Sequence, residues 1–124
     1  MHCIFCEIKK TKSRIILENT YAYAISDQYK VSQGHTLIIL KRHVSSLFEA
    51  SSEELTAIFD LAKKVQKLVS KQYQPDGYNV GFNDLEAAGQ SIPHCHMHII
   101  PRYKGDVKNP RGGIRGVIPG KQNY

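Results

Sequence analysis

Short apolar segments separated by polar stretches occupy much of the chain. Residues 15–17 and 21–26 predict two short strands, and the aliphatic run at 36–40 predicts a strand covered on both faces. Residues 78–82 and 94–100 alternate between polar and apolar side chains and predict two further strands. The pattern therefore predicts a sheet of about five strands.

One longer segment, residues 51–73, has helical periodicity. Ser51 and Glu54 have the S-x-x-E spacing of a capping box, in which each side chain bonds a backbone N–H of the first turn. The residues that follow at three- and four-residue spacing on one face are Leu55, Ile58, Phe59, Ala62, Val65, Leu68, Val69 and Gln72. The lysines that fall mostly toward solvent are Lys63, Lys64, Lys67 and Lys71. The helix is expected to end near Tyr73, because the Pro-Asp-Gly turn at 75–77 cannot continue it.

Together these elements predict an α+β domain, with an antiparallel sheet of about five strands and one long helix packed on it. The Cys-rich N-terminal segment is expected to form a turn. Residues 104–124 contain five glycines and two prolines among basic side chains, so little regular structure is expected there.

Length, charge and cysteine content narrow the class of protein. The chain has 124 residues and a formal net charge of +6, which fits one globular domain and favours an anionic partner. No apolar run approaches the roughly 18 residues of a membrane span, and no basic cluster is interleaved with aromatic residues, so neither a membrane nor a nucleic-acid partner is expected. Three cysteines without a signal peptide upstream indicate metal or redox chemistry in a reducing compartment, and hence a cytoplasmic protein.

The main candidate for chemistry is a row of three histidines, His94, His96 and His98. Period two places them on one face of a strand and turns the apolar residues between them to the other face. A neutral imidazole can attack phosphorus without first losing a proton, and its neighbours can bond phosphate oxygens. Such a row is also compatible with a metal site or with packing. The segment Gly89-Gln90-Ser91 just upstream offers backbone N–H groups and neutral polar side chains, which favours phosphate over metal.

The segment resembles the signature of the histidine triad (HIT) superfamily, H-φ-H-φ-H-φ-φ with φ apolar. The resemblance covers residues 3–103 and includes Ile4-Phe5, Asp27, Gly34-His35, Asn83, the residues from Ala88 to Ser91, and Pro101-Arg102. It is nearest to the short bacterial HIT proteins of the diadenosine tetraphosphate hydrolase-like type. The resemblance implies a HIT-like fold with a HIT domain at 1–103 followed by a basic, Gly-rich tail at 104–124, and a homodimer.

The resemblance also implies a reaction. His96 would attack the α-phosphorus of an adenosine nucleotide, such as a dinucleoside polyphosphate or a phosphoramidate, and the nucleotidyl-histidine would then be hydrolysed without a catalytic metal. The residues implied to assist catalysis are His98, Ser91 and His35. The residues implied to bind substrate are Ile4, Phe5, Ile8 and Ile25 around adenine, Asp27 at the ribose, and Asn83, Gly89, Gln90, Ser91 and His98 at the phosphates.

Each of these residues also has a structural interpretation. Asp27 and Asn83 lie in predicted loops, where such residues commonly form turns. Phe5, Ile8 and Ile25 are equally suited to a core, and His35 to a buried structural position. Arg102 and Arg111 meet remote phosphates if the tail folds back, whereas a solvated tail gives them no such role. A nucleotide-binding or sensing module with little turnover is the alternative function, and a metallohydrolase with its metal on the triad is another.

A metal site is predicted beside the triad. Cys3 and Cys6 supply half of a tetrahedral set. His43 and His94 are the plausible completions, and similar Cys2His2 sites occur in some HIT proteins, so a structural zinc ion is expected to hold the N-terminus against the triad. Free thiols or a redox pair are the alternatives, and His2 is a competing ligand.

Overall fold

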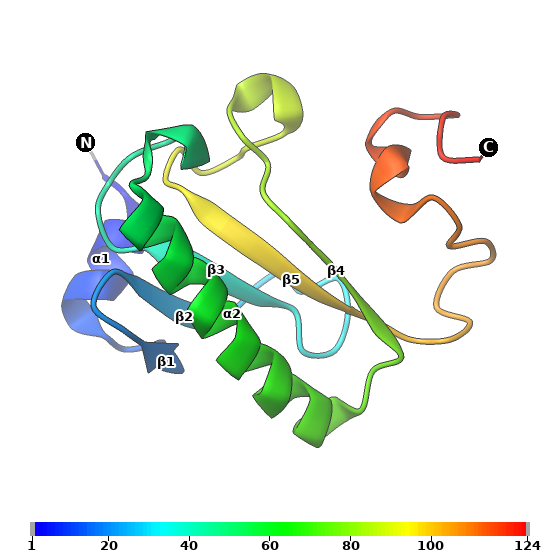
Figure 1. Ribbon diagram of the computed structural model, residues 1–124, viewed down its shortest axis with the longest axis horizontal. Helices are drawn as coiled ribbons and strands as arrows, with labels where there is room; N and C mark the ends of the chain where they lie inside the picture. The colour runs from blue at the N-terminus through cyan, green and yellow to red at the C-terminus, as the bar shows by residue number, and fades with distance from the viewer. Residues whose placement is uncertain (1, 124) are drawn as a thin grey trace.

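A five-stranded antiparallel sheet forms the centre of the structure, a computed structural model that describes residues 2–123 (Figure 1). The strand order is β1-β2-β3-β5-β4, with every neighbouring pair antiparallel. The strands are β1 (Leu17–Glu18), β2 (Ala22–Ser26), β3 (Thr36–Leu40), β4 (Gly77–Gly81) and β5 (His96–Arg102). The predicted α+β class and five-stranded sheet are confirmed.

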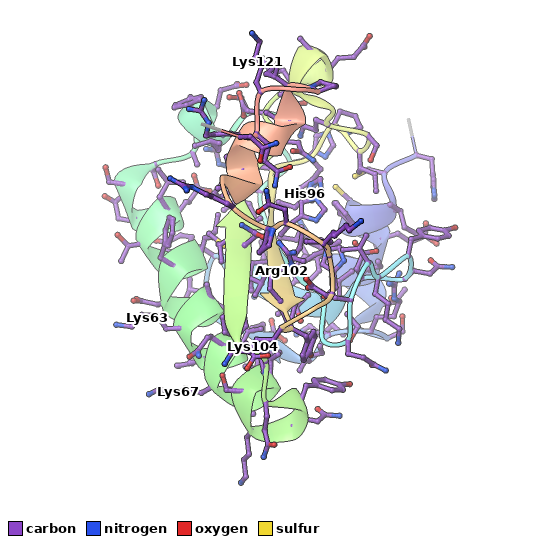
Figure 2. The ribbon with its side chains drawn as sticks, turned by 90° about the vertical axis from the view of Figure 1, so that its right-hand side faces the viewer. Lys63, Lys67, His96, Arg102, Lys104 and Lys121 are labelled. Carbon is purple, nitrogen blue, oxygen red and sulfur yellow. The ribbon has the colours of Figure 1, made fainter. Side chains whose placement is uncertain are left out.

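The long helix α2 (Ser52–Tyr73) lies across one face of the sheet (Figure 1). Both bonds of the predicted capping box are present, between Ser51 and Glu54. The buried stripe of the helix consists of Glu54, Ile58, Leu61, Val65 and Val69. Phe59 and Leu68, predicted to face the core, are 51% and 46% exposed, because Leu61 occupies the centre of the stripe. The lysines lie on the solvent side, as Figure 2 shows for Lys63 and Lys67.

A short helix, α1 (Ile4–Thr11), covers part of the opposite face, where the sequence predicted only a turn. Its Phe5 and Ile8 pack on alternate residues of the strands, among them Tyr23 and Ile39. The Tyr23 hydroxyl donates to the Phe5 carbonyl oxygen. Glu7 in the first turn and two lysines in the last turn suit the helix dipole. Because α1 and α2 cover both faces, every residue of β3 is buried, as predicted.

Strand boundaries differ from the prediction at three places. Of the first predicted strand, residues 15–17, only Leu17 lies in β1, and β4 spans Gly77–Gly81 rather than residues 78–82. The last strand begins at His96 rather than His94 and continues through Pro101. Proline is tolerated there because β3 pairs with β5 only as far as Ile99, so no ladder bond needs the missing N–H on that side.

The C-terminal segment contains a 3-10 helix, η3 (Gly113–Val117), and bonds to itself. The side-chain amide of Gln122 donates to the carbonyl oxygens of Asn109 and Arg111, at 3.1 and 2.9 Å. Gly112 has a φ of 86°, and a Cβ there would lie 2.0 Å from the Gln122 carbonyl oxygen, so this turn requires glycine. The tail is thus more ordered than the expected Gly-rich coil. Among residues 2–123, no helix is both long and apolar enough to cross a membrane.

Candidate active site and metal cluster

The histidine row lies where the chain enters β5. His96 and His98 are strand residues two positions apart, on the α1 side of the sheet, with 5.2 Å between their ring centroids. The residues that alternate with them are buried in the core beneath α2, as predicted: Cys95, Met97 and Ile99. His94 precedes the strand, so the prediction that all three histidines belong to one strand is wrong for this residue. Its ring still lies on the α1 side, edge-on to Phe5 at 5.7 Å between centroids.

His96 has one ring nitrogen fixed by the backbone. Its Nδ1 lies 2.7 Å from the carbonyl oxygen of His94, so Nδ1 carries the hydrogen and donates it. Nε2 is then the nitrogen with the lone pair. Burial lowers the pKa of His96 below its ordinary value, and the bond to the His94 carbonyl offsets only part of that shift. His96 is therefore a neutral imidazole with a nucleophilic nitrogen at neutral pH.

A chain of hydrogen bonds sets the tautomers of His35 and His98. The backbone N–H of Val31 donates to His35 Nδ1 over 3.1 Å, so His35 carries its hydrogen on Nε2. That Nε2 lies 3.0 Å from His98 Nδ1 and 3.3 Å from Asp27 Oδ2, and both of these atoms can accept. His98 therefore carries its own hydrogen on Nε2. Through His35, the Val31 N–H thus determines that His98 carries its hydrogen on Nε2, where it can be donated.

Burial keeps this pair of imidazoles neutral. Desolvation, with the neighbouring His96 and His35, lowers the pKa of His98 to about 4. Desolvation also lowers the pKa of His35, although the Asp27 carboxylate opposes that shift. Asp27, His35 and His98 offer ligand atoms within 4.8 Å of one another, a spacing suited to a metal ion. However, His35 Nδ1 already accepts an N–H, so metal at its Nε2 would require an imidazolate. The group is better suited to hydrogen bonding.

A cavity of about 400 Å³, here named the triad cavity, lies on the α1 side of the sheet. The predicted site residues that line it are Ile4, Phe5, Ile25, Asp27, Ser91, His96 and His98. One part of the lining is apolar and the other carries a carboxylate, a hydroxyl and two imidazoles. A flat heterocycle joined to a hydroxyl-bearing, anionic group fits such a lining.

Further lining residues were not predicted: Arg14, Gln28, Tyr29, Leu37 and Ile92. Arg14 supplies the one lysine or arginine among the described residues of this lining, and its Nη2 donates to the Ser26 carbonyl oxygen at 3.2 Å. No sequence signal identified it, because it follows a helix that was not predicted. Leu37 was accessible to period-two reasoning, since it lies two positions after His35 and pairs with His98.

Two predicted binding residues lie near the triad cavity without lining it. Ile8 is buried beside Phe5 in the apolar cluster between α1 and the sheet. Asn83 lies at a second cavity, which it shares with His98 and His35. Ile8 therefore supports the floor of the site, and a contact between Asn83 and a phosphate stays a prediction.

Gly89 and Gln90 shape the loop that precedes the triad. Gly89 has a φ of 92°, which glycine adopts readily. The Gln90 amide bridges the loop, because its Oε1 accepts from the Leu85 N–H at 2.7 Å and its Nε2 donates to the Ser45 carbonyl oxygen at 2.9 Å. In this arrangement the Gln90 side chain bonds protein backbone, and its phosphate contact stays a prediction.

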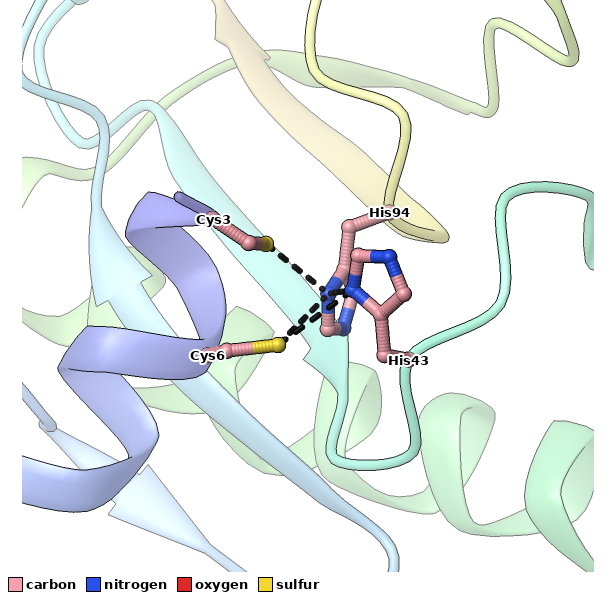
Figure 3. A group of neighbouring side chains, drawn as sticks. All are labelled: Cys3, Cys6, His43 and His94. Atoms are coloured by element: carbon pink, nitrogen blue, oxygen red, sulfur yellow. Dashed lines mark hydrogen bonds between the residues drawn. The ribbon is translucent and has the colours of Figure 1, made fainter. Parts of the chain in front are cut away.

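The predicted metal ligands Cys3, Cys6, His43 and His94 converge beside α1 (Figure 3). The Cys6 Sγ lies 3.3 Å from His43 Nδ1 and 3.7 Å from His94 Nδ1. The Cys3 Sγ lies 3.5 Å from His94 Nδ1, and the two Nδ1 atoms are 3.0 Å apart. A tetrahedral zinc ion, with bonds of about 2.3 Å to sulfur and 2.0 Å to nitrogen, holds its ligand atoms roughly 3.3–3.8 Å apart. The donor set fits zinc, and the three sulfur–nitrogen distances fall in this range, whereas the two Nδ1 atoms lie slightly closer together.

His94 is also oriented for this role. Its Nε2 donates to the Leu40 carbonyl oxygen at 2.6 Å, which leaves the Nδ1 lone pair facing the other three ligand atoms. Burial lowers the pKa of His94 to about 4, which favours the neutral form that a ligand must have. His2, the competing ligand, instead pairs with Glu7 at 3.2 Å.

Comparison with known proteins places this arrangement in a family. The model of the HIT domain matches residues 9–105. The chain belongs to the HIT family. Protein hit of Bacillus subtilis is 39% identical to this HIT protein over 108 residues, which cover 85% of this chain and 74% of the relative.

Two other relatives of this HIT protein have names that state an activity. The adenosine 5′-monophosphoramidase hnt1 of Schizosaccharomyces pombe is 38% identical over 104 residues, covering 82% of this chain and 75% of the relative. The asymmetrical bis(5′-nucleosyl)-tetraphosphatase of the same yeast is 35% identical over 94 residues, covering 76% of this chain and 52% of the relative.

Solved structures agree with the fold. A HIT family protein from Bacillus subtilis superimposes with a TM-score of 0.78 at 36% identity, covering 85% of this chain and 76% of that one. A zinc-bound histidine triad family protein from Mycobacterium smegmatis gives 0.77 at 30% identity, covering 86% and 78%.

Proposed function

We propose that this HIT protein is a nucleotidyl hydrolase that cleaves at the α-phosphate of adenosine nucleotides through a covalent intermediate on His96. The observation that carries the proposal is the orientation of this ring, whose Nδ1–H is bound to the His94 carbonyl and whose Nε2 lone pair remains for attack in the triad cavity. Relatives named as a phosphoramidase and as a tetraphosphatase support a substrate of this class.

In the first step, His96 Nε2 forms a bond to the α-phosphorus while the bond from phosphorus to the leaving atom breaks. The electron pair of that bond departs with the leaving group. His98 Nε2–H donates a hydrogen bond toward this group, and Ser91 assists at the phosphate oxygens. A leaving amine also takes up one proton from solvent. The preorganised donors stabilise the charge that develops on the phosphate.

In the second step, water attacks the phosphorus of the nucleotidyl-histidine, and the P–N bond to His96 breaks. The electron pair returns to Nε2, the nucleoside monophosphate leaves, and the water gives up one proton, which balances the proton taken up when an amine departs. Two in-line displacements retain configuration at phosphorus. His35 is a positioning residue, because it acts through its 3.0 Å bond to His98.

The nucleoside is proposed to lie in the triad cavity. Ile4, Phe5 and Ile25 offer an apolar slot for adenine, and the Asp27 carboxylate can accept from the ribose hydroxyls. Asp27 is held for this purpose by the Tyr29 N–H, which donates to its Oδ1 at 2.8 Å.

A structural zinc ion is proposed at Cys3, Cys6, His43 and His94, where it would link the start of α1 to the entrance of β5 and stabilise that link. All four positions belong to the protein, and the reaction steps need no catalytic metal.

A homodimer is also proposed. β4 is a terminal strand whose outer edge pairs with no strand among the described residues, and its Val80 is 41% exposed. Light scattering at two protein concentrations tests the dimer, and a monomer mass at both concentrations contradicts it.

Intact mass spectrometry after rapid mixing with adenosine 5′-phosphoramidate tests the mechanism. The wild type is expected to gain the mass of an adenylyl group, and His96→Ala to lose the adduct and at least about 10³-fold in kcat. His2→Ala, which alters an exposed histidine outside the triad cavity, is the matched control and should keep both.

Two outcomes distinguish the sensing module from the hydrolase. Turnover by His96→Ala at the wild-type rate contradicts a covalent role for this residue. Nucleotide binding with neither adduct nor product in the wild type supports a sensing module instead.

A further inference from the structure

A further cavity, here named the helix cavity, lies on the α2 side of the sheet and has a volume of about 490 Å³. Its walls come from the C-terminal half of α2 and from the ends of β2 and β3, where the loop of residues 27–35 joins these strands. Cavities of roughly 300–1,000 Å³ commonly hold small molecules. Among the described residues that line it, none belongs to β4, so the helix cavity is separate from the edge proposed for the dimer.

The register of β2 and β3 places hydroxyl groups in this cavity. Ala24 and Ile38 pair with each other and belong to the apolar core beneath α2. Ser26 and Thr36 pair at the end of the same ladder, two positions away, so the pleat turns them to the α2 side as well. The Thr36 hydroxyl donates to the Gly34 carbonyl oxygen at 2.8 Å. The Ser26 hydroxyl has no hydrogen-bond partner among residues 2–123, so it can donate to a ligand.

The apolar part of the lining comes mainly from α2. Val65 and Val69 are buried, whereas Leu68 beside them is 46% exposed. Ile16, which precedes β1, is equally exposed and lines the same cavity. Two large aliphatic side chains therefore keep much of their surface in water around one recess. A ligand with an aliphatic body would remove that surface from water.

Two lysines give the helix cavity its charge, Lys30 from the loop and Lys71 from α2. Neither makes an ion pair or a hydrogen bond with another residue in the part of the chain that the structure describes, whereas Lys41 pairs with Glu18. No aspartate or glutamate is found among the described residues of this lining, in contrast to the triad cavity with its Asp27. An anion would therefore meet two lysines and no carboxylate.

We propose that the helix cavity is a second ligand site, which binds a small molecule with an aliphatic body and one anionic head group. The body lies against Ile16 and Leu68. The head group meets Lys30 and Lys71 and accepts from the Ser26 hydroxyl. A recess with walls from a helix and two strands favours a small molecule over a flat membrane surface. The site does not depend on the proposed function, because the triad cavity lies on the other face of the sheet.

Isothermal titration calorimetry with octanoate tests this proposal, with octan-1-ol as the uncharged probe of the same chain length. The wild type is expected to bind octanoate about tenfold more tightly than octan-1-ol, because only the carboxylate interacts with the lysines. Saturating AMP is expected to leave octanoate binding in place, since the nucleotide is proposed to occupy the triad cavity.

A pair of double variants tests the charge. Lys30→Gln/Lys71→Gln should weaken octanoate binding by about fivefold or more, while the affinity for octan-1-ol stays the same. Lys63→Gln/Lys67→Gln is the matched control, because it removes the same charge from the solvent side of α2, outside the helix cavity (Figure 2). This control should bind octanoate as the wild type does.

A second pair of variants tests the apolar wall. Leu68→Ser should weaken the binding of octanoate and octan-1-ol alike, by about threefold or more, because both ligands lose the same aliphatic contact. Phe59→Ser is the control, since Phe59 is also exposed on α2 and does not line the cavity.

Four outcomes overturn the proposal. The first is equal affinity of the wild type for octanoate and octan-1-ol, and the second is an equal loss of octanoate affinity in the two lysine double variants. The third is displacement of octanoate by AMP, which assigns octanoate to the triad cavity. The fourth is sedimentation of the protein with phosphatidylglycerol vesicles in the absence of octanoate binding, which assigns the lysines to a membrane surface.

Discussion

At the scale of single residues, backbone groups decide which nitrogen of each imidazole can act. The Leu40 carbonyl fixes His94, the His94 carbonyl fixes His96, and the Val31 N–H fixes His35. As a result, His94 presents a lone pair to the cysteine–histidine cluster and His96 presents one to the triad cavity, whereas His98 presents a hydrogen. Three similar side chains within five positions thus have different chemistry, because each meets a different partner.

The lowered pKa of His98 predicts an unusual acid limit for the reaction. Because its pKa is about 4, His98 keeps a free Nδ1 lone pair above that pH. Protonation of His98 Nδ1 would place its hydrogen opposite the Nε2–H of His35, 3.0 Å away, and would break the hydrogen bond between the two rings. Burial also lowers the pKa of His96 and of His35, and the group with the highest pKa of the three sets the acid limit. We therefore expect kcat/KM for adenosine 5′-phosphoramidate to fall by half at a pH below the ordinary histidine value of about 6.5.

The pH profile needs two controls. His96→Ala measured at each pH gives the uncatalysed hydrolysis of the P–N bond, and circular dichroism shows whether the fold persists. A half-point at or above pH 6.5 with the fold intact contradicts a set of buried, neutral imidazoles at these three positions.

Residue spacing and the resemblance to the HIT signature together predicted much of the candidate site, but not the orientation of its side chains. Seven predicted residues line the triad cavity: period two placed the histidines of the triad on one face, and the resemblance implied the other five. Gln90 illustrates the limit, because whether its amide meets a ligand or the Leu85 and Ser45 backbone depends on the loop geometry. Arg14 illustrates another, since its position depends on α1.

At the scale of elements, α1 and α2 depend on different interactions. α2 has 22 residues and a complete capping box, so its sequence alone predicts it. α1 has eight residues, too few for independent stability, and it is held by packing and by the cysteine–histidine cluster. His94 belongs to the same cluster and precedes the β5 ladder. Period-two reasoning placed His94 in the strand because it considers only local alternation.

Loss of the proposed zinc ion is expected both to loosen α1 and to weaken nucleotide binding. Cys6→Ser removes one of four ligands, so zinc content measured by atomic emission should fall well below one per chain, and Tm should drop. AMP affinity by calorimetry should also fall, because Ile4 and Phe5 of α1 line the triad cavity. The Cys6→Ser effects should resemble those of a chelator on the wild type.

His2→Ala is the control for this change, since His2 lies next to Cys3 in sequence but pairs with Glu7. It should retain the zinc, Tm and AMP affinity of the wild type. Full zinc content in Cys6→Ser would contradict the proposed ligand set, and unchanged AMP affinity in a zinc-free variant would contradict the link between the cluster and the triad cavity.

At the scale of the whole molecule, the structure shows contacts across the predicted boundary between the domain and the tail. The predicted division falls after residue 103, yet Asp106 binds the Arg102 guanidinium through both carboxylate oxygens and accepts from the Tyr103 N–H at 3.0 Å. These bonds tie residues on the two sides of that division together. Sequence composition marked the Gly-rich stretch but could not show that one acidic residue within it bonds the end of β5.

Two truncations that differ by four residues test whether the Arg102–Asp106 pair stabilises the domain. A chain ending at Val107 keeps the Arg102–Asp106 pair, whereas a chain ending at Tyr103 loses it. Differential scanning calorimetry should give the longer truncation a Tm close to that of the full chain. The shorter one should have a lower Tm, because it loses this ion pair at the end of β5. If the chain ending at Val107 also unfolds many degrees earlier than the full chain, residues 108–124 are part of the folding unit, and the contacts of Asp106 do not account for the stability that the tail provides.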